Sequence, residues 1–306
     1  MRTLLICHAE DTLAREGLAR WLGSVSTLAG IVELREGRRH AWRRIRRELR
    51  RVGPARFLDV LAFRAYYRAV LGPRDRRWLE RRMVELRERY PPVLPPSRVP
   101  VLATDSPNSR HAEGFLRERA PDLVLAVCKR LLAERIFSVP ASGTWVLHPG
   151  ICPEYRNAHG CFWALAHRDL EKVGTTLLRI DRGVDTGPVY GYFGCDYDEV
   201  AESHVRIQRR ALLDNLDGIA GTLTAAHENR IRPLDTTGRP SAAWGQPWLS
   251  RHLRWKLHAR LRLRSCWCTG RSASGRRRPP TPVADGGEPE PARAYPPKQS
   301  SSGSPP

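Results

Sequence analysis

Seven short apolar runs, separated by helical stretches, constrain the fold of residues 1–233 more than any other feature of the chain. The runs are TLLICH, GIVEL, VPVLA, DLVLAV, TWVLHP, TTLLRI and PVYGYF, and stretches such as LAREGLARWL and EGFLRERA lie between them. Strands that are apolar throughout are typical of a sheet that is covered on both faces, and their alternation with helices favours parallel pairing. The pattern predicts an α/β fold with a mostly parallel sheet, in which a ligand would bind at the carboxyl ends of the strands.

Residues 34–99 interrupt this alternation. Trp42, Ile45, Leu49 and Val52 recur at helical spacing, and arginines fill the positions between them, which predicts a basic helical insertion. Two interpretations remain open. Either the arginines extend into water from a helical layer, or they form a surface for an anionic substrate or a membrane.

The net charge of +20 is concentrated in two segments. Residues 34–99 hold 20 basic and 7 acidic side chains, residues 251–278 hold 10 basic and no acidic ones, and the rest of the chain nets −3. The body that carries the apolar runs is therefore nearly neutral, and its chemistry does not require a polyanion. Nothing resembles a sequence-reading nucleic-acid module, so a nucleic-acid partner is not expected.

The chain after the last apolar run divides into two parts. Residues 234–270 predict a basic amphipathic helical segment, in which Leu249, Leu253, Leu257 and Leu261 fall four apart. This leucine stripe could lie on a membrane surface or pack on the body. Residues 271–306 have the Pro-, Ser- and Gly-rich composition of a disordered tail and are excluded from the fold. No apolar run is long enough for a signal peptide or a membrane span, so a cytoplasmic protein is expected.

The densest cluster of reactive side chains runs from residue 144 to residue 161. His148 directly follows an apolar run and precedes Pro149, so its imidazole is expected at the carboxyl end of a strand. Asp185 lies in the glycine-flanked loop DRGVDTGP between two later runs. Cys152, His159 and Cys161 are also close, but their spacing matches no usual zinc site, and no metal is expected.

Three segments in this order carry a more specific signal. They are PDLVLAVCKRLL at 121–132, VLHPG at 146–150 followed by CPEYRN at 152–157, and DRGVDTGP at 181–188. Together they resemble the formyltransferases that use 10-formyltetrahydrofolate, which act on glycinamide ribonucleotide, methionyl-tRNA or amino sugars. The family patterns are Asn-x-His-Pro-Ser, Leu-Pro-x-Tyr-Arg-Gly and Asp-x-Gly-x-Asp-x-Gly-Pro.

The resemblance implies a Rossmann-like sheet of the formyltransferase type, carrying the basic helical insertion, and transfer of a formyl group from 10-formyltetrahydrofolate to an amine. It implies that protonated His148 donates to the developing oxyanion or to the leaving nitrogen. Asp185 would orient His148 and draw the amine proton off through a water. The residues expected to line the pterin slot are Arg130, Leu131, Leu132, Arg182, Gly183 and Val184.

This chain departs from the family patterns at three positions. Val146 stands where the family has its catalytic Asn, Gly150 replaces Ser, and Asn157 replaces Gly. Losing one oxyanion donor typically costs on the order of 10²–10³ in rate. We expect Asn157 or His159 to supply the missing donor.

Other activities remain open alternatives. Water instead of an amine could accept the formyl group, which would make the chain a formyltetrahydrofolate hydrolase. The other alternative is a folate-binding protein that has lost its catalytic activity. A sugar or another small anionic amine is the expected acceptor, because the basic insertion and the basic tail helix resemble the sugar-modifying or otherwise specialised branches of the family. Methionyl-tRNA is disfavoured, because residues 234–306 do not predict the β-barrel that methionyl-tRNA enzymes carry there. Turn residues Asp105-Ser-Pro-Asn108 follow a strand, and Asn108 is expected to cap the next helix.

Overall fold

The computed structural model describes residues 1–35, 38–92 and 99–268. Its centre is a seven-stranded sheet in the order β3-β2-β1-β4-β5-β7-β8. The strands are β1 (Arg2–His8), β2 (Thr27–Leu34), β3 (Val101–Thr104), β4 (Leu123–Val127), β5 (Thr144–His148), β7 (Thr175–Arg179) and β8 (Val189–Phe193). The first five strands run parallel, whereas β7 is antiparallel to both of its neighbours. Each apolar run in the sequence contributes one strand, which confirms the predicted α/β class.

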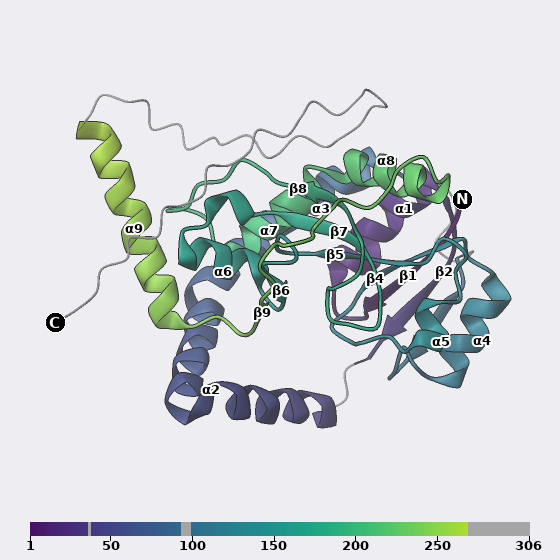
Figure 1. The fold of residues 1–306 in the computed structure, drawn as a ribbon, viewed down its shortest axis with the longest axis horizontal. Coiled ribbons are helices and arrows are strands. Elements are labelled where there is room, and N and C mark those ends of the chain that lie inside the picture. The colour runs from purple at the N-terminus through teal and green to yellow at the C-terminus, as the bar shows by residue number, and fades with distance from the viewer. Residues whose placement is uncertain (36–37, 93–98, 269–306) are drawn as a thin grey trace.

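Helices cover both faces of the sheet (Figure 1). One face is covered by η1 (Leu13–Leu18), α1 (Ala19–Val25), α3 (Gly72–Arg89) and α8 (Leu216–His227), and the other by α4 (Arg110–Arg119) and α5 (Glu134–Phe137). The alternation of side chains along β1 separates the two cores. Leu5 packs with Trp21 on the first face, and Leu4 packs with Leu116 on the second.

Helix α2 (Arg38–Tyr66) begins the helical insertion and bends sharply at its middle. Gly53 has a φ of 77°, and Pro54, which follows it, lacks an amide hydrogen, so the helix divides into the two arms seen in Figure 1. The second arm buries Phe63 and leads through η2 (Tyr67–Leu71) into α3. On the first arm Trp42 is 66% exposed, so the apolar stripe predicted there is not part of the core.

The chain after α8 crosses the body before it forms the last helix. Strand β9 (Ala243–Trp244) pairs in parallel with β6 (Arg156–Asn157), and α9 (Leu249–Cys268) then packs against α2 and α6 (Gly160–His167). The remaining helices are η4 (Leu170–Lys172) and α7 (His204–Leu213). The last two residues of the predicted 234–270 segment and the whole predicted tail, 271–306, lie outside the described residues. No described helix has both the length and the apolar character needed to cross a membrane.

Helix α9 packs on the body with a face that differs from the leucine stripe. It buries His252, Trp255, Lys256 and Ala259, while Leu253, Leu257 and Leu261 are 52%, 55% and 48% exposed. The interpretation that the leucine stripe packs on the body is therefore wrong for these three leucines.

Candidate active site

His148 is the last residue of β5 and is nearly fully buried at the carboxyl end of the sheet. Its Nδ1 atom lies 3.3 Å from Oδ2 of Asp185, and its Nε2 atom lies 2.7 Å from the backbone carbonyl of Tyr155. Both partners accept hydrogen bonds, so only the doubly protonated imidazole donates to both of them. The Tyr155 carbonyl thereby fixes the ring, and the Nδ1 edge faces the carboxylate.

Asp185 reaches His148 from the loop between β7 and β8. Its backbone is left-handed, with a φ of 51°, and Oδ2 also accepts the backbone N–H of Asn157 at 2.8 Å. Asp181 closes the same loop, since its Oδ1 accepts hydrogen bonds from the amide of Gly183 and the hydroxyl of Thr186. The structure thus brings together the histidine and the aspartate that the sequence placed in separate motifs.

Val146 and Gly150, two of the three positions that depart from the family patterns, are both closely packed. Val146 packs beside Cys152, Leu178 and Val189 in an apolar cluster, and it offers no donor to an oxyanion. A Cβ atom on Gly150 would lie 2.7 Å from both the Cα atom of Gly160 and the carbonyl of Tyr155. A serine at position 150 therefore does not fit beside this backbone.

The side chains of Asn157 and His159 both contact the segment that crosses the body. The side-chain amide of Asn157 donates to the backbone carbonyl of Trp244. The ring of His159 bonds the side chain of Gln246 and lies 5.5 Å from the ring of His204. Burial lowers the pKa of His159 to about 4, and the positive charge of Lys129 adds to that effect. Compensation for Val146 by either side chain stays a prediction.

The loop after β4 carries three of the predicted folate-binding residues and is held by Asn108. The side-chain amide of Asn108 donates to the carbonyl of Leu131 at 2.9 Å, and its oxygen accepts the amide of Ala133 at 2.7 Å. Leu131 is 64% exposed, whereas Leu132 packs partly into the second core. Arg130 donates to the carbonyl of Asp105 at 3.3 Å.

The predicted role of Asn108 as a helix cap is wrong. Ser109 caps α4, since its hydroxyl accepts the amide of Ala112. Both residues precede the same helix and both are good caps, so the sequence could not distinguish between them. The loop-holding role of Asn108 depends on contacts more than 20 residues away, and no local signal announces it.

The three other predicted folate-binding residues lie in the Asp185 loop, and one of them bridges the two loops. Arg182 forms an ion pair with Glu134, at 2.8 Å, across to the segment that follows Leu132. The carbonyl of Val184 accepts a hydrogen bond from Arg156 at 2.8 Å, and Gly183 donates its amide to Asp181. The two loops therefore face each other beside the His148–Asp185 pair.

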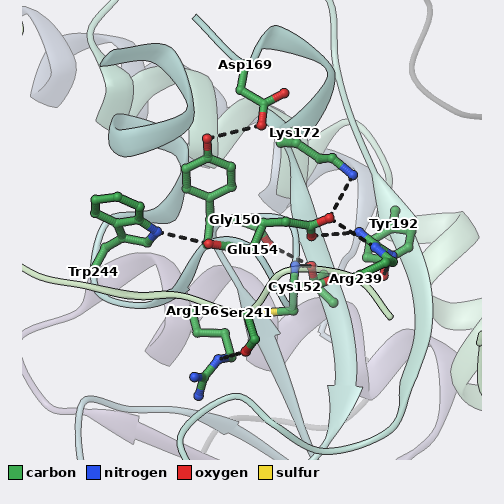
Figure 2. A network of polar contacts seen from close by, with 12 residues as sticks. Gly150, Cys152, Glu154, Arg156, Asp169, Lys172, Tyr192, Arg239, Ser241 and Trp244 are labelled. Atoms are coloured by element: carbon green, nitrogen blue, oxygen red, sulfur yellow. Dashed lines mark hydrogen bonds and ion pairs between the residues drawn. The ribbon is translucent and has the colours of Figure 1, made fainter. Parts of the chain in front are cut away.

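A polar network that the sequence does not reveal joins the loop after β5 to residues 239–244 (Figure 2). Glu154 forms ion pairs with Arg239 at 2.7 Å and Lys172 at 3.0 Å. Burial acts to raise the pKa of Glu154, but the hydrogen bonds from Arg239 and Lys172 outweigh it and hold that pKa below its ordinary value. Arg239 also donates to the hydroxyl of Tyr192, which in turn donates to the carbonyl of Cys152 at 2.7 Å.

Two further hydrogen bonds complete this connection. The indole of Trp244 donates to the carbonyl of Glu154 at 2.9 Å, and Arg156 donates to the hydroxyl of Ser241 at 2.9 Å. The segment that follows α8 is thus fixed directly against the loop that positions Tyr155. The partners lie more than 80 residues apart in the sequence, which is why no motif predicts them.

The nearby thiols are buried. Burial raises the pKa of Cys161 to about 12, so this thiol stays protonated and is a poor metal ligand. Within the described residues, no group of three or more His, Cys, Asp or Glu side chains is arranged to hold a metal ion.

Comparison with known proteins finds similarity to formyltransferases. Residues 86–219 match the sequence profile described as "Formyl transferase". The chain is 40% identical over 165 residues to a methionyl-tRNA formyltransferase from Mycobacterium sp. (strain KMS), covering 49% of this chain and 52% of the relative. It is 33% identical over 93 residues to one from Thermotoga sp. (strain RQ2), covering 30% of this chain and 29% of the relative.

Two solved structures are also similar. One is a phosphoribosylglycinamide formyltransferase from Anaplasma phagocytophilum, at 13% identity and a TM-score of 0.48, covering 81% of this chain and 99% of that one. The other is a sugar N-formyltransferase from Shewanella sp. FDAARGOS_354, at 12% identity and a TM-score of 0.48, covering 85% and 87%.

The sheet defines a protein of the α/β class, and residues 86–219 match the formyl transferase profile within it. Residues 86–219 are similar to the formyl transferase family, and this match covers less than half of the chain. The chain spans about half of the Mycobacterium relative and less than a third of the Thermotoga relative, so its own reaction and acceptor are matters for proposal.

Proposed function

We propose that the chain transfers a formyl group from 10-formyltetrahydrofolate to the amine of a small anionic acceptor. The observation that carries the proposal is the contact between His148 and Asp185 at the carboxyl end of β5. Similarity to the formyl transferase profile suggests the reaction class, and the two arginine-rich segments, 34–99 and 251–278, favour an anionic acceptor.

The acceptor nitrogen attacks the formyl carbon, and a C–N bond forms while the carbonyl oxygen takes up the electron pair. The protonated imidazole of His148 donates from Nδ1 to this oxygen or to the departing folate nitrogen. Asp185 accepts the proton that the amine loses, directly or through a water. The bond from carbon to the folate nitrogen then breaks, which yields an N-formyl product and tetrahydrofolate.

The Tyr155 carbonyl supports the choice of Nδ1 as the working atom. It accepts the Nε2 hydrogen at 2.7 Å, a normal distance, whereas the contact of Nδ1 with Asp185 is longer at 3.3 Å. Hydrogen bonds that serve catalysis are often long without substrate and tighten when it binds. A substrate oxygen can therefore approach the Nδ1 edge without releasing the ring from Tyr155.

The two facing loops supply the folate site in this proposal. Exposed Leu131 offers an apolar surface to the flat pterin ring, and the backbone between Arg182 and Val184 offers polar groups to its edge. Arg130 and Leu132 frame the loop from behind.

A folate-binding protein without transfer activity is the second candidate. Val146 favours it, because an apolar residue lies where the family places an amide donor, and the amide of Asn157 is engaged by the Trp244 carbonyl.

One experiment separates these candidates and the hydrolase. The purified chain is mixed with 10-formyltetrahydrofolate alone and with a nucleotide-linked amino sugar, glycinamide ribonucleotide or methionyl-tRNA, and tetrahydrofolate release is followed. Release that requires one amine supports transfer and identifies the acceptor. Release without any amine indicates hydrolysis, and folate binding without release indicates the second candidate.

A further inference from the structure

A cavity of about 250 Å³ lies where the kink of α2 meets α6, β9 and the start of α9. Its walls combine cations with aromatic rings: Arg51, Arg56, Arg251, His167, Trp163, Trp244 and Trp248, together with Val52 and Ala243. None of these side chains belongs to the His148–Asp185 pair or to the two folate loops.

The aromatic wall has two nearly perpendicular parts. Trp163 and Trp244 stack with their ring centroids 5.1 Å apart and their planes at 26°, and His167 lies 4.6 Å from Trp244. Trp248 meets Trp163 edge to face, at 5.3 Å and 88°. The indole nitrogens of Trp163 and Trp244 donate to backbone carbonyls. That of Trp248 is buried and has no hydrogen-bond partner within the described part of the chain.

The cations of the cavity are only partly neutralised. Arg56 and Arg251 both lie over the Trp248 ring, at 5.3 Å and 5.9 Å from its centroid. Across the ranges that the structure describes, neither of them forms an ion pair with a carboxylate. Two guanidinium groups beside one ring repel each other, and an anion between them would relieve that repulsion.

The third arginine is held at the edge of the cavity. Arg51 forms an ion pair with Glu48 at 2.7 Å, and its guanidinium lies directly against Gly245, where a Cβ atom would overlap it. The excess positive charge also reaches His167: burial lowers the pKa of this imidazole, and Arg251 lowers it further. A neutral His167 can then accept a hydrogen bond.

We propose that this cavity binds a ligand that joins a planar ring to an anionic group, of which a nucleoside monophosphate is the simplest representative. The ring packs on the Trp163–Trp244–Trp248 wall, and the phosphate lies between Arg56 and Arg251. Asn157 connects the cavity to the reaction centre. Its side-chain amide donates to the backbone carbonyl of Trp244, and its backbone N–H donates to the carboxylate of Asp185. Binding here does not depend on formyl transfer, and it is measured without turnover.

The test is isothermal titration of the full chain with adenosine monophosphate, adenosine and inorganic phosphate, in the absence of folate. We expect saturable binding of the monophosphate, with adenosine and phosphate each at least about 10-fold weaker. Arg56→Gln and Arg251→Gln should each lower the affinity for adenosine monophosphate by about 10- to 100-fold, the usual effect of losing a charge-assisted contact.

Two exposed arginines on the same helices serve as matched controls. Arg50→Gln and Arg254→Gln remove the same charge outside the cavity and should change affinity by less than about 3-fold. Equal losses in the controls would show nonspecific attraction to a basic chain and would overturn the proposal. Absence of saturable binding would also overturn it, as would equal affinity for inorganic phosphate.

Helix α9 carries an independent inference, because it buries polar groups and exposes leucines. Lys256 is buried and its ammonium donates to the carbonyls of Glu199, Val200 and Glu202. The indole of Trp255 donates to the carboxylate of Glu199 at 3.0 Å. These contacts fix the rotation of the helix, so the exposed leucines cannot turn toward the body.

The surface formed by Leu253, Leu257 and Leu261 is surrounded by positive charge. Arg254, Arg260 and Arg264 are exposed on the same helix, and residues 249–264 contain no acidic side chain. A second copy of the chain would oppose one basic face to another, whereas an anionic lipid surface complements both the charge and the leucines. The geometry points to α9 as a helix that lies on an anionic bilayer surface.

Vesicle sedimentation tests this inference. The chain should bind vesicles that contain phosphatidylserine, and it should not bind vesicles made only of phosphatidylcholine. Salt should weaken the binding. Leu253→Ser with Leu257→Ser should lower partitioning by about 10-fold or more. Val84→Ser, at an exposed site on α3, is the control and should have no effect. Equal binding of both vesicle types, or equal loss in the control, would overturn the inference.

Discussion

The Nδ1 atom of His148 lies 3.3 Å from the carboxylate of Asp185, although the two residues come from the end of β5 and the loop after β7. The same imidazole is held on its other side by the carbonyl of Tyr155. A ring held between a carboxylate and a carbonyl is fixed in orientation, with its Nδ1 edge directed to the carboxylate.

The carboxylate of Asp185 is expected to be essential for turnover. Asp185→Asn keeps the shape but loses the carboxylate that accepts the amine proton in the proposed reaction. We expect kcat to fall by about 10²–10⁴, with folate affinity little changed. Steady-state kinetics together with equilibrium folate binding measure both effects. Asp217→Asn, which breaks a surface pair with Arg89, is the control and should keep full activity.

Restoring the amide at position 146 tests whether the chain lacks an oxyanion donor. Val146→Asn should raise kcat by up to about 10²–10³ if no other group supplies that donor. It should also lower the melting temperature, because the amide enters an apolar cluster with Leu178 and Val189. Val146→Leu is the matched control. An unchanged rate in Val146→Asn, with folate still bound, would support compensation by Asn157 or His159.

The close contact of Gly150 with Gly160 makes a further prediction. Gly150→Ser restores the usual family residue, but its Cβ atom would lie 2.7 Å from two backbone atoms. We expect a marked drop in melting temperature and loss of turnover, since the Tyr155 carbonyl must move. Gly114→Ser, where the added atom meets open space, should be far milder. If Gly150→Ser were as stable as Gly114→Ser, the loop would have to be looser than described.

The sequence predicted the elements of the sheet well because apolar strands are local features. All seven runs became strands, and His148 and Asp185 were each assigned to the correct strand end or loop. Their meeting was suggested by family resemblance, since spacing alone does not bring two loops together.

Other features depended on contacts that no local pattern encodes. The Glu154–Arg239 pair and the β6–β9 ladder join residues far apart in the sequence. The leucines of α9 illustrate a different limit. Periodicity identified an apolar face, but the hydrogen bonds of Lys256 to three carbonyls decided which face is buried.

Buried neutral histidines should make stability depend on pH. Burial lowers the pKa of His204 well below its ordinary value of 6.5, and the neighbouring His159 lowers it further. As pH falls below 6.5 the unfolded chain gains a proton that the folded chain does not, so stability is present above that pH and declines as the pH falls further.

His204→Phe should reduce this decline. Both ring nitrogens of His204 are buried without partners among the described residues, next to Phe63 and Phe162. Removing one titrating group should lessen the pH dependence of the unfolding free energy below pH 6.5 by up to about 1.4 kcal/mol per pH unit. Denaturant unfolding at several pH values measures it, and His111→Gln, on the surface, should leave the slope unchanged.

Single-turnover transfer by His148→Gln tests the central claim most directly. The wild-type chain and the variant are each loaded with 10-formyltetrahydrofolate and mixed with the acceptor that the amine panel identifies, and formation of the N-formyl product is followed. The account predicts equal folate binding and a rate at least about 10²-fold lower in the variant. Equal rates in the two proteins would contradict the assignment of proton donation to His148.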